Sequence, residues 1–430
     1  MINFLFKNTP LMYLTQSIWR DEGFSYFMAR PNIIQVIKNS INDFNPPFYY
    51  IMLHFWMKLF GESDIALRML SFIFHILTVY FAFLLFRKLF GERFGWWAAA
   101  FTFLNPMLLY YGFELRMYSV FAFFTMASTL YFIEKRWRRY VIVTTLGIYT
   151  HSFFLLIILS QLLYLYITKQ LIKKSVKYVL TPVVFFLPWL PFLIWQFGQS
   201  KNTWIYPVNI QLVFSSLGNL FVGYEGTPGG LWVLTFALSL VLILFIYSAL
   251  KKGKKIGYLA AIYTLFPLGL VLLYSIIRRP IYVNRYLIFV TVGEILAISS
   301  TIGRTKVKKL RYIWMGFWLI FIIVIDLISV SFHKKINIRA TIMEISRLAK
   351  SDDVVYTQTP LVYFESAFYF PDKERVFIYN PKNITIPKYI GTAVIPKEKS
   401  MLDFPESPAR TFLVQEDGSF EVIMKKVNSQ

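Results

Sequence analysis

The sequence predicts an α-helical polytopic membrane protein with about ten spans and a small C-terminal α/β domain. Of its 430 residues, 57% are hydrophobic and only 16% are charged. Apolar runs of about 18 or more residues recur up to about residue 331, which is typical of transmembrane helices. From about residue 332 the composition becomes charged and short strand patterns appear. A soluble repeat protein is disfavoured, because buried helices seldom lack a polar face over such lengths.

The first 60 residues contain no clear span. Residues 1–16 are too short and too polar to cross a membrane, and they lack the features of a secretory signal. Residues 46–60 are apolar but include His54 and Lys58. At 1.5 Å per residue this run reaches about 22 Å, short of a hydrocarbon core of roughly 30 Å. We therefore expect an interfacial or half-inserted helix there.

Clear spans are predicted at 64–86, 94–112, 115–133, 178–197, 231–250, 256–277, 286–302 and 312–331. The region 140–168 allows one long helix, or two short helices broken near Thr150-His151. Five basic clusters follow successive spans and fall on one side of the membrane only if 140–168 crosses twice. These clusters are Arg87, Lys88 and Arg93; Lys135, Arg136, Arg138 and Arg139; Lys169, Lys173, Lys174 and Lys177; Lys251, Lys252, Lys254 and Lys255; and Arg304, Lys306, Lys308, Lys309 and Arg311.

The positive-inside rule makes the side with these clusters cytoplasmic. The protein is then expected in the plasma (inner) membrane, with its tail and the loop near residue 21 outside. Asp21, Glu22, Glu114, His151 and the pair Arg278/Arg279 fall on or near this outer face. The formal charge of +22 reflects the cytoplasmic loops, so we expect no nucleic-acid partner. An outside amino terminus implies that residues 1–16 dip into the membrane or that an upstream helix is absent, and their length favours the second.

The tail is long enough to fold as a small domain. We predict a transmembrane domain over 1–331 and an extracytoplasmic α/β domain over 332–430. Within the tail, 338–350 is expected to be a helix, and 353–357, 374–379 and 392–395 are expected to be strands. A hairpin is predicted between 411–415 and 419–424. Before the tail, 209–222 has the pattern of an amphipathic helix on the membrane surface.

Two adjacent carboxylates, Asp21 and Glu22, precede the first apolar segments and follow Trp19. A solvated surface pair is the ordinary interpretation of such neighbours. Beside a membrane-interface tryptophan, however, carboxylates are costly and tend to be functional. A carboxylate there can accept the proton of an attacking hydroxyl or hold a divalent cation. We therefore expect this pair to take part in chemistry.

Further charged residues lie near the outer face. Glu114 and Arg116 are two residues apart, so on a helix they would not face each other as a local ion pair. The alternative is that they are helix-end charges at the headgroups. Arginines outside the membrane run against the positive-inside trend, and Arg278, Arg279 and Arg285 suit phosphate, whose oxygens fit the guanidinium fork. Their alternative role is to reach lipid phosphates.

Other chemistries are disfavoured. A histidine such as His151 near the outer face is more often packed or hydrogen-bonded than catalytic. The sequence has no cysteine, hence no disulfide and no thiolate metal site. It lacks GxxxxGK[ST], HExxH and GxSxG, which argues against ATP-driven transport and the familiar hydrolases.

The sequence resembles the membrane glycosyltransferases of the GT-C type (family 39), which include the dolichyl-phosphate-mannose protein mannosyltransferases and the lipid A aminoarabinose transferases. Motifs in matching order extend over most of residues 17–300. They are Ser17-Ile18-Trp19-Arg20-Asp21-Glu22, Asp43-Phe44-Asn45-Pro46-Pro47-Phe48-Tyr49-Tyr50, Gly61-Glu62-Ser63-Asp64-Ile65-Ala66-Leu67-Arg68, Glu114-Leu115-Arg116-Met117-Tyr118-Ser119, Tyr149-Thr150-His151 and Pro280-Ile281-Tyr282-Val283-Asn284-Arg285-Tyr286-Leu287. The chain departs from the family at Asn45, where a histidine is usual, and in having no transmembrane helix before the acid pair.

The resemblance implies a transferase that moves a hexose or pentose from a polyprenyl-phosphate carrier to an acceptor hydroxyl on a protein, lipid or glycan. Asp21 would match the catalytic acid position and act as general base, with inversion at the anomeric carbon. Glu22 and Glu114 would be supporting carboxylates. The substrate-binding residues would be Arg285, Arg278, Arg279, Arg116, Tyr118, His151 and Tyr286. The resemblance implies no certain cofactor and leaves a divalent cation open.

Two other classes of function remain. A secondary transporter would also have many spans, but its charges should lie near the bilayer midplane. In this sequence the notable charges gather at one rim. A non-catalytic membrane scaffold that presents the outer domain is the second alternative. Replacing Asp21 separates the three, because only a transferase would lose turnover while remaining folded.

Overall fold

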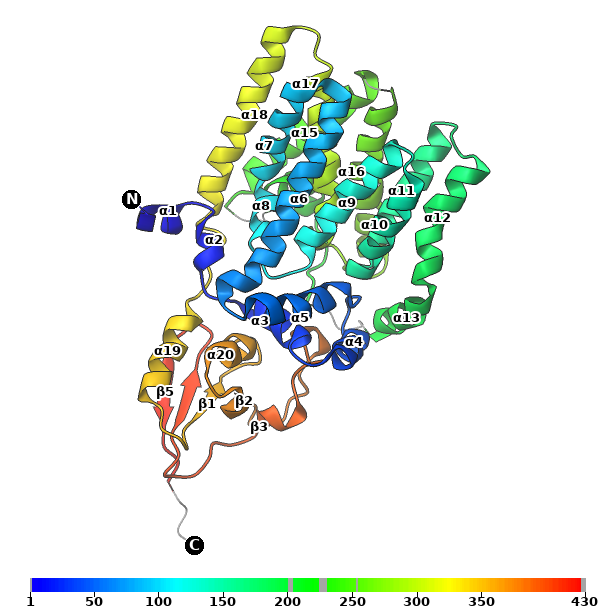
Figure 1. The fold of residues 1–430 in the computed structure, drawn as a ribbon. Coiled ribbons are helices and arrows are strands. Elements are labelled where there is room, and N and C mark those ends of the chain that lie inside the picture. The colour runs from blue at the N-terminus through cyan, green and yellow to red at the C-terminus, as the bar shows by residue number, and fades with distance from the viewer. Residues whose placement is uncertain (1, 200–203, 224–229, 253, 427–430) are drawn as a thin grey trace. The chain divides into compact units, whose positions relative to one another are not determined.

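The computed structural model describes residues 2–199, 204–223, 230–252 and 254–426 (Figure 1). These residues form two compact units. Unit 1 comprises Met1–Tyr13, Arg68–Trp195 and Thr203–His333, and unit 2 comprises Leu14–Leu67, Gln196–Asn202 and Lys334–Gln430. Unit 2, which contains the tail, therefore also includes about fifty residues from near the amino terminus. The predicted boundary at residue 331 separates a transmembrane domain from an extracytoplasmic domain. This boundary stays a prediction.

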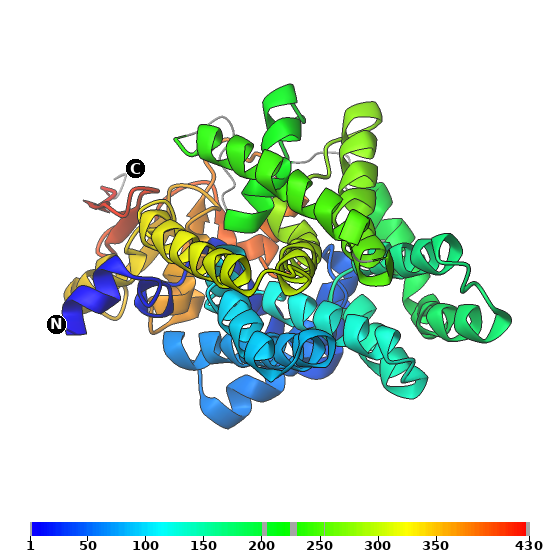
Figure 2. The ribbon, with the colours of Figure 1, turned by 90° about the horizontal axis from the view of Figure 1, so that it is seen from above.

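Unit 1 is a bundle of helices that run side by side (Figures 1 and 2). Its elements are α1 (Ile2–Asn8), α6 (Asp64–Phe90, which starts in unit 2), α7 (Glu92–Phe103), α8 (Pro106–Gly112), α9 (Tyr118–Ile133), α10 (Trp137–Thr150), α11 (Phe154–Ile167), α12 (Lys173–Phe186), η1 (Leu187–Trp189), α13 (Leu190–Gln199, which ends in unit 2), α14 (Ile210–Val222), α15 (Trp232–Lys252), α16 (Lys254–Ile277), η2 (Asn284–Leu287), α17 (Ile288–Gly303) and α18 (Lys308–Ser329). The short α2 (Met12–Thr15) joins the two units.

Six helical stretches in the described part of the chain are long and apolar enough to span a membrane. They are α6, α12 with α13, α15, α16, η2 with α17, and α18, and α9 and α11 are shorter apolar helices. Every residue of α17 is buried, since it packs against α15, α16 and α9. The predicted polytopic helical class is confirmed, and the number of ten spans stays a prediction.

One predicted span is split in two, and the region 140–168 forms two helices. The span 94–112 is split into α7 and α8 at Asn105, whose side chain accepts a hydrogen bond from the Leu108 amide (3.1 Å) and caps α8. The region 140–168 is two helices, as the basic clusters required, because His151 adopts an extended conformation between α10 and α11. Gln161 on α11 then joins neighbouring helices: it accepts from Tyr140 (2.5 Å) and donates to Tyr263 (2.8 Å).

The expectation of a surface helix at 209–222 is wrong for most of its length. Helix α14 does form there, but residues 215–222 are buried in unit 1. Gly218 explains the close packing, because a Cβ at this position would lie 2.0 Å from the Thr235 carbonyl oxygen of α15. Two serines and an asparagine on this helix gave it an amphipathic pattern, but Ser215, Ser216 and Asn219 are all buried. On the neighbouring α15, the Ser239 hydroxyl accepts a hydrogen bond from the Gly218 amide (2.8 Å).

Unit 2 combines the early helices α3 (Arg20–Ala29), α4 (Ile33–Asn42) and α5 (Phe48–Phe60) with the tail. The tail contains α19 (Ile338–Leu348), β1 (Val354–Thr357), α20 (Tyr363–Tyr369), η3 (Lys373–Arg375), β2 (Val376–Tyr379), η4 (Lys388–Ile390), η5 (Lys397–Lys399), β3 (Ser400–Met401), β4 (Thr411–Val414) and β5 (Phe420–Ile423). The sheet order is β3-β2-β1-β4-β5, with β4 and β5 as the predicted antiparallel hairpin and the other pairs parallel.

The strand expected at 392–395 is absent, and these residues form turns and bends. Gly391 has φ = 108°, a left-handed conformation that ends the preceding η4 turn. A Cβ there would lie 2.6 Å from the Phe24 ring, so glycine also permits close packing on α3. The short apolar run therefore serves as a loop.

Candidate active site

Glu22 lies in the first turn of α3, and its side chain makes structural contacts. It stands at the third helical position and accepts a hydrogen bond from the Trp19 backbone amide (3.3 Å), as in a capping box. The same carboxylate oxygen pairs with the Lys335 ammonium at 3.3 Å. That ammonium also lies 4.9 Å from the centre of the Trp19 ring. The Glu22 side chain is fully buried, so its charge is balanced within unit 2.

Asp21 has a more open position. Its side chain is 15% exposed, and one carboxylate oxygen accepts a hydrogen bond from Arg20 Nε at 3.1 Å. An ionised carboxylate can accept a proton from a hydroxyl. Of the two adjacent acids, Asp21 is therefore the one that a substrate can reach.

The segment before Asp21 is attached to α20. Glu365 accepts a hydrogen bond from the Arg20 amide (2.8 Å). Tyr369 accepts one from the Ile18 amide (2.7 Å) and donates to Asp64 at 2.5 Å. Backbone amides of two residues next to the acid pair are thus held by side chains from the tail.

Helix α19 holds the same segment through Arg339. The Arg339 guanidinium donates to the Thr15 carbonyl (2.7 Å) and to Asp64 (2.9 Å). The Arg339 amide donates to the Ser17 hydroxyl at 3.1 Å. Residues 15–20 are therefore fixed at several successive positions by α19 and α20. Sequence reasoning missed Glu365, Lys335, Tyr369 and Arg339, because these contacts join residues more than 300 positions apart.

Glu365 is nine-tenths buried, and burial raises its pKa to about 7. The hydrogen bond from the Arg20 amide and the charges of Lys335 and Arg20 act in the opposite direction, whereas Glu22 adds to the rise. A carboxyl group that titrates near neutral pH thus contacts the turn that carries Asp21.

In unit 1, Glu114 and Arg116 lie in the non-helical turn between α8 and α9. The helix begins only at Tyr118, three residues later than the predicted span, so the helical argument about their spacing does not apply. Both side chains are buried, and the Arg116 amide donates to the Glu114 carbonyl at 2.7 Å. The Arg116 guanidinium lies 5.8 Å from the centre of the Tyr118 ring.

Aromatic contacts connect Tyr118 with His151 and Tyr286. The His151 ring centre lies 6.2 Å from that of Tyr118 and 5.4 Å from that of Tyr286. His151 also stacks on Phe121 at 5.0 Å, and its Nδ1 accepts a hydrogen bond from the Phe153 amide (3.2 Å). An Nδ1 acceptor implies a neutral ring with its proton on Nε2. His151 is therefore packed and suited to donating a hydrogen bond.

Arg285 completes this group, which we call the aromatic–arginine cluster (Arg116, Tyr118, His151, Arg285 and Tyr286). It is buried in η2, with its guanidinium 5.9 Å from the centre of the Tyr286 ring and 5.1 Å from that of Trp204. Arg278 is exposed directly after α16, and the described contacts do not join it to the cluster. Arg279 is half-buried in the same turn. Five of the seven predicted substrate-binding residues thus lie together.

The two groups belong to different units: Asp21 and Glu22 to unit 2, and the aromatic–arginine cluster with Glu114 to unit 1. Within the described residues, no set of three histidine, aspartate or glutamate side chains is arranged to hold a metal ion. Each group therefore offers acid–base and anion-binding chemistry of its own.

Comparisons with known proteins agree with this fold. Residues 45–195 match the family model described as dolichyl-phosphate-mannose-protein mannosyltransferase. The crystal structure of ArnT from Cupriavidus metallidurans in the apo state superposes with a TM-score of 0.64 at 11% identity, over 94% of this chain and 91% of ArnT. The chain has the GT-C glycosyltransferase fold.

The same GT-C fold appears in two further structures. ArnT from the same organism bound to undecaprenyl phosphate has a TM-score of 0.60, again at 11% identity over 94% of this chain and 91% of ArnT. The Archaeoglobus fulgidus oligosaccharyltransferase in complex with zinc and sulfate has a TM-score of 0.51 at 11% identity, over 93% of this chain and 64% of that protein. A comparison with curated protein sequences gives no significant match.

Proposed function

We propose that this protein transfers a sugar from a polyprenyl-phosphate donor to an acceptor hydroxyl, with Asp21 as general base. The observation that supports this most directly is the contrast within the acid pair: Glu22 is buried against Lys335, whereas Asp21 stays partly exposed. A fold shared with ArnT, one structure of which contains undecaprenyl phosphate, supports the choice of donor.

The reaction we propose is a direct displacement. Asp21 accepts the proton of the acceptor hydroxyl while its oxygen attacks the anomeric carbon. The bond from that carbon to the phosphate oxygen breaks, and the polyprenyl phosphate leaves with the bonding electrons. Attack opposite the leaving group inverts the anomeric configuration. A departing phosphate is stabilised by positive charge, which Arg285 and Arg116 supply from the aromatic–arginine cluster.

The remaining predicted residues have supporting roles in this proposal. Tyr118 and Tyr286 flank the two guanidinium groups, and His151 offers Nε2–H as a donor to substrate oxygens. Glu114 orients the acceptor or Arg116. We place Arg278 and Arg279 at the donor headgroup only because of their charge. The site faces the extracytoplasmic side of the plasma (inner) membrane, as the distribution of basic loops indicates.

The test is turnover by purified protein in lipid nanodiscs. A panel of polyprenyl-phosphate hexoses and pentoses is supplied, and release of the free polyprenyl phosphate is measured. We expect one donor to be consumed by the native protein, and Asp21→Asn to lower its turnover about 10²–10⁴-fold without changing the melting temperature. Asp352→Asn, an exposed acid in the tail, is the matched control and should keep full activity.

Undiminished turnover by folded Asp21→Asn would exclude Asp21 as the base. Solute flux in proteoliposomes without any donor consumption would instead indicate a transporter. Neither result is expected from a transferase whose general base is Asp21.

A further inference from the structure

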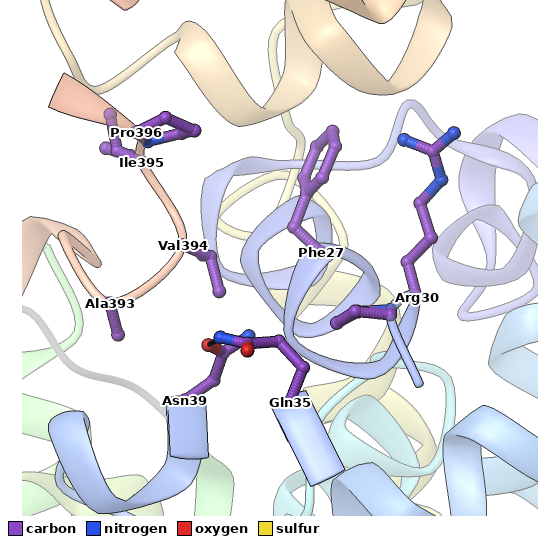
Figure 3. Close-up of a pocket in the computed structure, with 9 residues that line it drawn as sticks. Phe27, Arg30, Gln35, Asn39, Ala393, Val394, Ile395 and Pro396 are labelled. Atoms are coloured by element: carbon purple, nitrogen blue, oxygen red, sulfur yellow. Dashed lines mark hydrogen bonds between the residues drawn. The ribbon is translucent and has the colours of Figure 1, made fainter. Parts of the chain in front are cut away.

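Unit 2 contains a cavity of about 470 Å³ that none of the predicted catalytic or substrate-binding residues lines. Figure 3 shows its walls: the end of α3 with Phe27 and Arg30, the α4 residues Gln35 and Asn39, and the loop 393–396 of the tail. Three separate segments of one unit thus line an open cavity with room for a small polar molecule.

One wall carries a pair of amides. Gln35 Nε2 donates to Asn39 Oδ1 at 2.8 Å, and the two side chains lie next to each other in Figure 3. Asn39 is only 5% exposed, yet its amide group reaches the cavity. Among the described residues, neither amide makes another side-chain hydrogen bond. Whichever way the two amides are turned, one N–H donor and one carbonyl acceptor remain available to a ligand.

The cavity is also positively charged. The Arg30 side chain lines it and makes no hydrogen bond or ion pair with the residues that the structure describes. No lining residue is acidic. The Lys373 ammonium lies 5.8 Å from the centre of the Tyr26 ring on helix α3. Burial and then the charge of Arg30 lower the pKa of Lys373, while Glu62 acts in the opposite direction. An unneutralised guanidinium at the wall favours a ligand with an anionic group.

The opposite walls are apolar. Phe27 packs against Phe364 with ring centres 5.9 Å apart, which fixes one side of its ring. Val394, Ile395 and Pro396 add aliphatic surface across the cavity. A sugar ring has hydroxyls at its edge and C–H groups on its faces. Paired amides, an aromatic ring and aliphatic side chains are complementary to both kinds of surface.

We propose that this cavity binds an anionic sugar of the acceptor, such as a uronic acid or a sugar phosphate. The proposal rests on the proposed transferase function. Phe27 lies on the same helix as Asp21, six residues and about 9 Å further along its axis. It points about 120° away from Asp21 around that axis. The sugar in the cavity is therefore not the one that receives the transfer, and the acceptor is a glycan of more than one unit.

The binding test uses saturation-transfer NMR with purified full-length protein and three probes: glucuronic acid, glucose 1-phosphate and glucose. We expect signal from the two anionic sugars and much less from glucose. Arg30→Ala and Gln35→Ala, both at exposed side chains, should weaken binding of the anionic sugars about tenfold. Lys38→Ala is the matched control, since Lys38 is an exposed cation on the same α4 helix that does not line the cavity, and it should bind as the native protein does.

Three outcomes would overturn the proposal: no binding of any probe, equal binding by Arg30→Ala and native protein, or displacement of the sugars by phosphatidylglycerol, which would make the cavity a lipid headgroup site. Release of polyprenyl phosphate by the same samples is measured separately. If the native protein binds the anionic sugars but consumes no donor, the transferase function fails while the sugar site stands. If it consumes a donor but binds no sugar, only the sugar site fails.

Discussion

Asp21 and Glu22 are adjacent in the sequence, but the structure gives their side chains different surroundings. Glu22 is enclosed between Trp19 and Lys335, and Asp21 is partly exposed beside Arg20. The family resemblance implied different roles for the two acids, but the sequence could not show that Glu22 is buried in an ion pair, because the lysine that pairs with it lies 313 residues away. The two acids should consequently respond differently to neutral substitutions.

Glu22→Gln should act mainly on stability. The amide retains an acceptor for the Trp19 backbone but removes the ion pair between Glu22 and Lys335. We expect a loss of about 1–3 kcal/mol in unfolding free energy. Thermal unfolding measured beside Asp21→Asn checks this, since Asp21→Asn should melt as the native protein does. Equal melting of native protein and Glu22→Gln would contradict the structural role.

Glu365 should make stability depend on pH. Its pKa of about 7 in the folded protein exceeds the value of about 4.3 expected in an unfolded chain. Between these values the folded state binds the proton more tightly, so stability falls as pH rises from about 4.5 to 7. The loss should be on the order of 2–3 kcal/mol.

Glu365→Gln keeps an acceptor for the Arg20 amide and removes the titration. Melting temperatures of native protein and variant are compared between pH 4.5 and 8, and the difference between them should change across that window. Glu344→Gln, at an exposed acid of α19, serves as the control and should follow the native protein. A pH-independent difference for Glu365→Gln would refute this prediction.

At the scale of elements, α3 and α20 depend on a glycine for their close packing. A Cβ on Gly23 would lie 3.0 Å from backbone atoms of Phe364, which cannot move as a flexible side chain would. Gly23→Ala should therefore cost about 1–3 kcal/mol and lower turnover by shifting the acid pair. Gly316→Ala on α18, where no heavy atom lies within 4 Å of the new Cβ, should be neutral or stabilising. Thermal melting and donor consumption of both variants give the comparison.

The elements themselves were predictable to the extent that they depend on local pattern. Long apolar runs predicted α6, α15, α16 and α18, and the Glu416-Asp417-Gly418 turn predicted the β4–β5 hairpin. Two predictions from local pattern failed because packing between distant segments determined the structure. Residues 392–395 have a strand-like composition but pack as a loop on α3, and α14 has surface-like polarity but is buried beside α15. Such outcomes depend on distant partners that no local pattern contains.

At the scale of the whole molecule, the proposed orientation has a direct test because the chain has no cysteine. Single cysteines at Asp352, in the tail, and at Lys174, in a basic loop, are exposed to a membrane-impermeant maleimide on intact cells. We expect Asp352→Cys to be labelled at once and Lys174→Cys only after permeabilisation, because the basic loops should be cytoplasmic. The opposite pattern would place the proposed site inside the cell.

The candidate site could be predicted only in part, because only some of its residues lie in recognisable sequence motifs. The sequence motifs indicated Arg116, Tyr118, His151, Arg285 and Tyr286, and unit 1 brings these residues together. Charge alone indicated Arg278, which lies exposed outside the cluster. The tail residues that hold the acid pair carry no recognisable motif, so only the folded chain shows them.

Segment 15–20 and helices α19 and α20 come from opposite ends of the chain yet share one set of hydrogen bonds. Chimeras built from two relatives should therefore fail when the tail alone is exchanged at residue 332. They should recover when the donor of the tail also supplies residues 14–67, because these residues and the tail belong to the same compact unit.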